Sequence, residues 1–243
     1  MGQDSTSAIA WGVLAASSLV IGALLALLRT WPQRLIGLVL AFGAGALLSS
    51  VSFELFEDGV DLGGGWAVGL GLAAGACTYY ALDRLLEPPH PATGDQTDRG
   101  SAGTGLALGA FLDGVPEQLV LGIGLAGGTG VSVSLLVAIF VSNLPEATGS
   151  ASEMRDAGEP ARRIIGLWVV VASVCSLATF GGYAVADAVP ERIQAAVNGF
   201  AAGALLVMLV DSMIPEASAK AERAAGLVAV LGFAVAAGLS MLR

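Results

Sequence analysis

The chain has 243 residues, of which 55% are hydrophobic and 13% are charged. Soluble domains carry about 25% charged residues, so this chain has too few ionic side chains to solvate a globule of its size. The composition therefore excludes an ordinary soluble domain and predicts a polytopic membrane protein. The net charge of −9 argues against a nucleic-acid partner, because phosphate binding requires clustered Lys and Arg side chains.

Apolar runs follow one another along almost the whole chain, and each is close to the roughly 20 residues that a helix needs to cross the hydrocarbon core. The runs are rich in Ala, Leu and Gly and lack the alternating pattern of barrel strands. We therefore predict an all-α fold with eight transmembrane helices in a single domain covering residues 1–243. The predicted helices cover residues 8–28, 35–53, 66–82, 105–126, 131–150, 164–186, 193–214 and 224–242.

The basic residues predict the orientation of these helices. An even number of spans places both termini on one side of the bilayer, and all of the eleven Lys and Arg residues except Arg192 and Arg243 then fall on the other side. Cytoplasmic loops carry the excess of Lys and Arg. The sequence thus predicts a multi-pass protein of the cell membrane with its termini outside. Residues 87–104 are polar and contain His90, the only histidine, which we interpret as a solvated residue of a flexible cytoplasmic loop.

Two smaller patterns concern the cysteines and a short internal similarity. Cys77 and Cys175 lie in apolar runs without metal-site spacing, which predicts buried free thiols rather than a disulfide. The sequence AGALL occurs at residues 44–48 and again at 202–206, and acidic residues follow both copies. Short identities of Ala, Leu and Gly are common in membrane segments, so the sequence alone does not decide whether the two copies form an internal repeat.

Several carboxylates lie within or at the ends of the predicted spans, and an ionised carboxylate near the centre of the bilayer costs about 2.5–3.5 kcal/mol or more to insert. No Lys, Arg or His lies within the eight runs to neutralise them. Protons or a bound cation must therefore supply the compensating charge. Asp113 and Glu117 lie in the fourth run and Glu146 in the fifth, Asp211 and Glu216 lie where the seventh ends, and Glu54 closes the second.

The spacing of the central polar residues favours a cation site. Asp113 and Glu117 are four residues apart and share one helical face, and Asn143 and Glu146 are three apart and share another. Each pair is a potential two-ligand edge.

A proline precedes a glutamate in both segments, in the sequences DGVPE and SNLPE. Pro116 and Pro145 cannot donate an amide proton to the carbonyls of Leu112 and Val141, so each helix is expected to kink beside its acid. The freed carbonyls are additional oxygen ligands, of the kind found where broken helices line a cavity.

The segments DGVPEQ, SNLPEA, AGALLSSVSFELFED and AGALLVMLVDSMIPEA resemble the Zrt/Irt-like (ZIP) divalent metal transporters. The resemblance implies eight helices with both termini outside, a mid-membrane metal site on the fourth and fifth helices, a variable cytoplasmic loop after the third helix, and frequent dimers. Carried over by position, the metal ligands are Asp113, Glu117, Asn143 and Glu146. Ser142 is a weak contributor, and Asp211 matches a position on the entry route.

The chain departs from the family pattern at both motif histidines. Asp113 and Gly114 stand in the first motif and Ser142 and Asn143 in the second, while a glutamate that relatives often have in the sixth helix falls near Ser176. Oxygen ligands favour Mn²⁺, Mg²⁺ and Ca²⁺, whereas the imidazole of histidine favours Zn²⁺. The expected cargo is a divalent cation, Zn²⁺ with Mn²⁺ or Fe²⁺ as alternatives, and no cofactor is expected.

Other interpretations of these acids stay open. Protonated carboxyls and a membrane Asn can act as hydrogen-bonded links between helices, and acids at helix ends can be solvated at the interface. An intramembrane aspartyl protease would use Asp113 and Asp211, but the chain has neither a GxGD nor a PAL sequence, so we do not expect an enzyme. A ZIP-like protein that no longer transports and has a metal-sensing or structural role is the main alternative.

Overall fold

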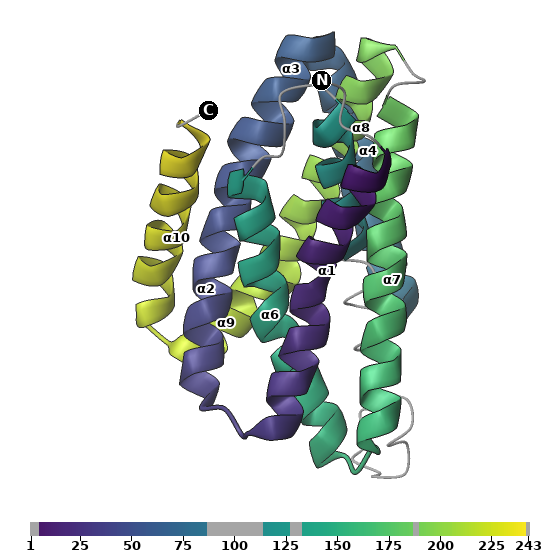
Figure 1. Ribbon diagram of the computed structural model, residues 1–243. Helices are drawn as coiled ribbons and strands as arrows, with labels where there is room; N and C mark the ends of the chain where they lie inside the picture. Colours follow the sequence, from purple (N-terminus) through teal and green to yellow (C-terminus); the bar gives the residue numbers. More distant parts are fainter. Residues whose placement is uncertain (1–4, 87–113, 127–132, 187–189, 242–243) are drawn as a thin grey trace.

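Figure 1 shows the computed structural model, in which residues 5–86, 114–126, 133–186 and 190–241 are described. Within these ranges the regular structure is entirely helical. The elements are α1 (Ser5–Leu28), α2 (Gln33–Ser50), the π-helix η1 (Val51–Glu57), α3 (Asp58–Gly63), α4 (Gly65–Leu86), a helix over Gly114–Ala126, α6 (Val133–Asp156), α7 (Ala161–Ala186), α8 (Glu191–Met208), the π-helix η2 (Leu209–Met213), α9 (Ile214–Ala221) and α10 (Ala224–Ser240).

The predicted all-α class is confirmed, and each predicted apolar run overlaps a described helix. Four helical segments are long and apolar enough to cross a membrane by length and composition: Thr6–Leu28, Gln33–Gly63, Ala161–Ala186 and Glu191–Ala221. The helices Gly114–Ala126 and Ala224–Ser240 are also apolar but shorter within the described ranges. These segments are consistent with a membrane protein.

The second and seventh helices extend furthest beyond their predicted ends. The second continues past Phe53 through η1 and α3, and the seventh continues past Ile214 to the end of α9. The predicted limits follow the end of the apolar runs, but polar residues prolong a helix as long as their backbone stays helical. Each helix ends where the next residue has a positive φ, which is 86° at Gly64 and 52° at Glu222.

The two AGALL segments occupy equivalent structural positions. In both, the regular helix changes to a π-helix at the seventh residue after the first alanine, at Val51 in one copy and at Leu209 in the other. Both also place their glycine directly against the backbone of a neighbouring helix: Gly45 against Ala229 of α10, and Gly203 against Leu72 of α4. The short sequence similarity therefore corresponds to a repeated structural unit.

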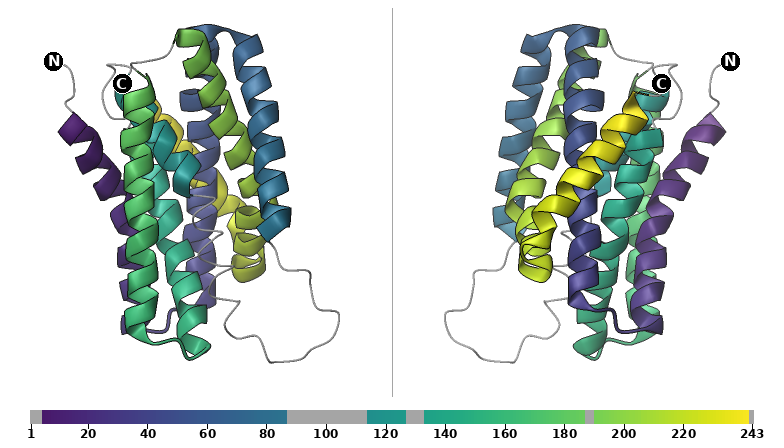
Figure 2. Two further views of the ribbon diagram at one scale, coloured as in Figure 1. Left: turned by 90° about the vertical axis from the view of Figure 1, so that its right-hand side faces the viewer. Right: turned by 90° about the vertical axis from the view of Figure 1, so that its left-hand side faces the viewer.

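The helices form two groups that meet where α2 packs against α6 (Figures 1 and 2). In one group α1 packs against α6 and α7, around the fully buried side chain of Trp168. In the other group α4 packs against α8, and α10 packs against α2. The contact between α2 and α6 is close, because a side chain on Gly43 of α2 would overlap Ser142 of α6.

Both ends of the described chain lie at one end of the bundle, because α1 begins and α10 finishes there (Figure 1). The α1–α2 and α6–α7 connections lie at the opposite end (Figures 1 and 2). Arg29 and Arg34 flank the first connection, and Arg155, Arg162 and Arg163 flank the second. The predicted gathering of basic residues at the end away from the termini is thus present in these elements.

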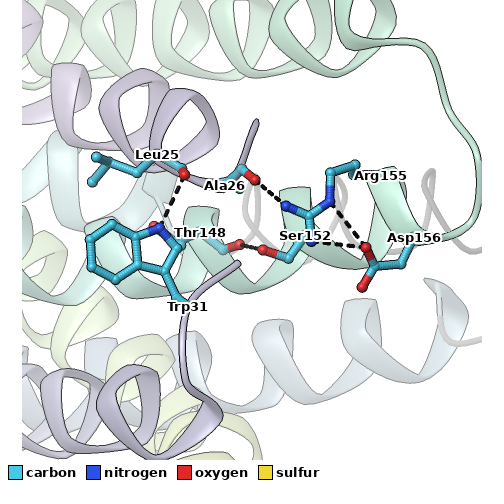
Figure 3. A network of polar contacts seen from close by, with 7 residues as sticks. All are labelled: Leu25, Ala26, Trp31, Thr148, Ser152, Arg155 and Asp156. Carbon is cyan, nitrogen blue, oxygen red and sulfur yellow. Dashed lines mark hydrogen bonds and ion pairs between the residues drawn. The ribbon is translucent and has the colours of Figure 1, made fainter. Parts of the chain in front are cut away.

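At this basic end one hydrogen bond joins α1 to α6, and another joins α1 to its connection with α2 (Figure 3). The guanidinium of Arg155 donates to the backbone carbonyl of Ala26 and is also paired with Asp156 at 2.9 Å. The indole Nε1 of Trp31 donates to the carbonyl of Leu25 at 3.0 Å. The bond from Arg155 satisfies the carbonyl of Ala26, which is one of the last four of α1, whereas the carbonyl of Leu25 also accepts the backbone N–H of Arg29 at 3.1 Å.

Candidate metal centre

The helix Gly114–Ala126 carries Glu117, which is 1% exposed, and Gln118, which is fully buried. The hydroxyl of Thr179 on α7 donates a hydrogen bond of 2.5 Å to Oε1 of Gln118. Glycines bring the two helices together, because Gly122 lies against the backbone of Thr179, and Gly182 against that of Leu119. This packing fixes Glu117 inside the bundle beside α7.

The other half of the candidate centre lies on α6. Ser142 and Asn143 are each 1% exposed, and Glu146 is half-buried. The hydroxyl of Ser142 donates to the carbonyl of Ile139 at 3.0 Å, so it is satisfied within its own helix. The buried Nδ2 of Asn143, in contrast, has no hydrogen-bond partner in the described part of the chain. Asn143 therefore differs from a membrane asparagine that links two helices through its amide nitrogen.

α1 positions this segment of α6. Gly22 of α1 lies against the backbone of Leu144, and the hydroxyl of Thr148 donates to the carbonyls of Gly22 at 3.2 Å and Leu144 at 2.7 Å. α6 continues through Pro145 as one helix to Asp156. The segment that carries Asn143 and Glu146 is therefore held from the α1 side.

Cys175 of α7 is a further polar residue in the interior of the bundle. The thiol is fully buried, and it interacts electrostatically with both Glu117 and Glu146. It also lies against Gly114, where a Cβ would be 2.7 Å from Sγ. The acids of the two Pro-Glu pairs thus both act electrostatically on one thiol of a third helix.

The sequence analysis did not include Cys175 among the candidate ligands. Its burial as a free thiol is confirmed, but burial of Cys77 is wrong, because that thiol is exposed on α4. α4 packs mainly against α8, which covers only one of its faces. The sequence signal that was available for Cys175 is its spacing of four residues from Thr179, which places both on one face of α7.

The remaining predicted ligands do not complete the centre within the described residues. Asp113 lies outside them, and Asp211 is an exposed residue of η2. Ser176 donates to the carbonyl of Ala172 at 2.8 Å. In the ranges given above, no three His, Cys, Asp or Glu side chains are placed to hold a metal ion. The described donors are therefore Glu117, Glu146 and the amide of Asn143.

The position of Glu54 at the end of an apolar run suggested an acid solvated at a helix end, but the structure places it in the interior. It lies inside the continuous helix formed by α2, η1 and α3, is 6% exposed, and accepts a hydrogen bond of 2.9 Å from the hydroxyl of Ser240. The acid belongs to the interior because α10 packs along this helix.

Glu216 and Lys220 form an ion pair of 2.5 Å on α9. The sequence placed Lys220 outside every apolar run, but it lies in the long helical segment Glu191–Ala221, and its side chain is only 16% exposed. A Cβ on Gly149 would be 3.5 Å from its Nζ. Gly149 follows Glu146 by three residues, so this cation lies against α6 about one turn beyond Glu146.

Comparisons with known proteins found no family model and no curated sequence that matches this chain.

Proposed function

We propose that the chain is a membrane transporter that moves divalent metal cations into the cytoplasm, as its resemblance to the ZIP family implies. In this proposal eight helices cross the cell membrane with both termini outside. The overlap of the eight apolar runs with helices supports the span count. The basic connections at the end away from the termini support the orientation.

The observation that carries the proposal is that two acids from separate helices, Glu117 and Glu146, both interact electrostatically with the buried thiol of Cys175. Glu117 is 1% exposed on the apolar helix Gly114–Ala126, and Glu146 is half-buried on α6. An ionised carboxylate loses hydration where it is buried, and two that lie close together repel each other. A divalent cation neutralises both charges at once, and a proton can replace it when the cation leaves.

The proposed path is one of alternating access. A cation enters from outside past Asp211, exchanges water for Asp113, Glu117, Asn143 and Glu146, and leaves on the cytoplasmic side. The direction of transport is taken from the family. Zn²⁺ is the proposed cargo, with Mn²⁺ and Fe²⁺ as further candidates, and a homodimer is the proposed assembly.

The test is metal uptake by the purified chain in phospholipid vesicles that contain a metal-sensitive dye. We expect Zn²⁺ or Mn²⁺ flux above that of empty vesicles, and a fall of about tenfold or more in Glu117→Gln and in Glu146→Gln, since each removes one full charge from the centre. Glu57→Gln makes the same chemical change at an exposed residue and should leave flux unchanged.

Flux that is equal in all three variants would contradict the proposed site. A folded parent protein that binds metal but moves none would instead favour the alternative, a ZIP-like protein with a sensing or structural role.

A further inference from the structure

An apolar groove of about 690 Å³ opens on the surface between the two helix groups. Its lining is made entirely of Gly, Ala, Val, Leu, Ile and Phe residues. Leu70 and Phe200 lie on the side of α4 and α8, and Gly181 and Val185 lie on the side of α7. Within a bilayer this groove faces the acyl chains, since Leu70 is 64% exposed and Val185 is 46% exposed.

The groove continues into a second hollow at the end of the bundle where α4 and α8 begin. The two hollows share Leu70, Ile193 and Ala196. The second is also lined by Trp66, which is 84% exposed, and by Arg192. The apolar groove therefore leads to the guanidinium of Arg192 and the exposed indole of Trp66. A Trp side chain commonly lies at the level of the lipid headgroups.

Arg192 is available to bind a ligand. It is exposed, and none of the ion pairs between described residues involves it. The neighbouring acids Glu191 and Asp61 are also exposed, but neither lines the hollow. Gly63 packs against the backbone of Arg192, so the base of the side chain is held at the mouth of the groove.

The length of the groove is close to the thickness of one leaflet of the bilayer. Along α4 the lining extends from Trp66 to Ala74, which corresponds to about 12 Å at the helical rise. Half of the hydrocarbon core is about 15 Å thick. A chain that begins at the level of Trp66 and Arg192 would thus run along the groove through most of one leaflet.

We propose that this groove binds a membrane phospholipid, with one acyl chain between α4, α8 and α7 and its phosphate at the guanidinium of Arg192. Arg forms charge-assisted, often bidentate hydrogen bonds with phosphate. Trp66 flanks the headgroup. The proposal requires that the chain lie in a membrane, but it does not depend on metal transport.

The test measures lipid retained by the purified full-length chain in native mass spectrometry. Phosphatidylglycerol, phosphatidylcholine and diacylglycerol with identical acyl chains are added separately. We expect retention of a phospholipid, about five- to tenfold weaker retention of diacylglycerol, and a similar loss of phospholipid in Arg192→Gln. Arg223→Gln, which changes an exposed arginine at the opposite end, should behave as the parent chain.

A second pair of variants tests the apolar part of the site. Gly181 lines the groove and has open space around it, so Gly181→Leu fills the groove without a clash and should lower phospholipid retention. Gly166→Leu is the matched control, because Gly166 also lies on α7 and has equally open surroundings. Equal phospholipid retention in all four variants would overturn the proposal. It would also be overturned if the parent chain bound no lipid but formed a dimer that Gly181→Leu dissociates, because a second copy of the chain would then cover this face.

Discussion

The ammonium of Lys220 and the carboxylate of Glu216 are 2.5 Å apart on successive turns of α9, and both face Gly149 of α6. The side chain of Lys220 is 16% exposed and that of Glu216 is 38% exposed. The ion pair thus lies between α9 and α6, about one helical turn beyond Glu146. It also places a cation of the chain beside the segment of α6 that lies within the predicted apolar run 131–150.

This ion pair is expected to make a modest contribution to stability. Lys220→Met removes the charge and keeps the stem, and Glu216→Gln removes the partner charge. Because the pair is partly solvated, we expect a coupling energy of about 0.5–1 kcal/mol from a double-mutant cycle. Urea unfolding in detergent micelles measures it, and a coupling energy of zero would show that the two charges do not stabilise the fold.

The hydrogen bond from Ser240 to Glu54 is expected to contribute more, because the acceptor is buried. Ser240→Ala leaves a buried carboxylate with one donor fewer and should lower the free energy of unfolding by about 1–3 kcal/mol. Ser173→Ala is the control, since Ser173 is exposed and bonds only to the carbonyl of Val169 in its own helix. If both variants lost the same stability, Glu54 would not depend on Ser240.

The repeated glycines Gly45 and Gly203 are expected to be intolerant of a side chain. A Cβ at either position overlaps a backbone carbonyl of the neighbouring helix, so Gly45→Ala and Gly203→Ala should each destabilise the fold by about 1–3 kcal/mol. Gly226→Ala on α10 has open surroundings and should be neutral or stabilising by up to about 1 kcal/mol. Thermal unfolding of the three variants makes the comparison, and similar melting temperatures would contradict close packing at these glycines.

The position of Cys175 bears on metal preference, because a thiolate favours Zn²⁺ over Mn²⁺ relative to oxygen ligands. On the proposed transport function, Cys175→Ser should lower the ratio of Zn²⁺ to Mn²⁺ uptake severalfold. Cys77→Ser, at an exposed thiol, should leave the ratio unchanged. An unchanged ratio in Cys175→Ser would mean that the thiol stays outside the coordination shell, and the oxygen-only ligand set expected from the sequence would then hold.

Much of the fold was predictable from local sequence. Apolar runs of helical length predicted where the helices lie, and their limits were wrong mainly at Phe53 and Ile214, where polar residues continue the helix. Of the candidate site, the burial of Glu117 and Asn143 agrees with their place in apolar segments.

Composition, apolar run length and the positions of Lys and Arg alone determined the all-helical class and the gathering of basic residues at one end of the bundle. Tertiary packing decided which polar groups meet: the thiol of Cys175 lies near Glu117 and Glu146, Ser240 bonds to Glu54, and Lys220 lies beside α6. The physical reason is that helix formation depends on neighbouring residues, whereas these meetings join residues far apart in the chain. They exist only because small residues let particular helices approach closely.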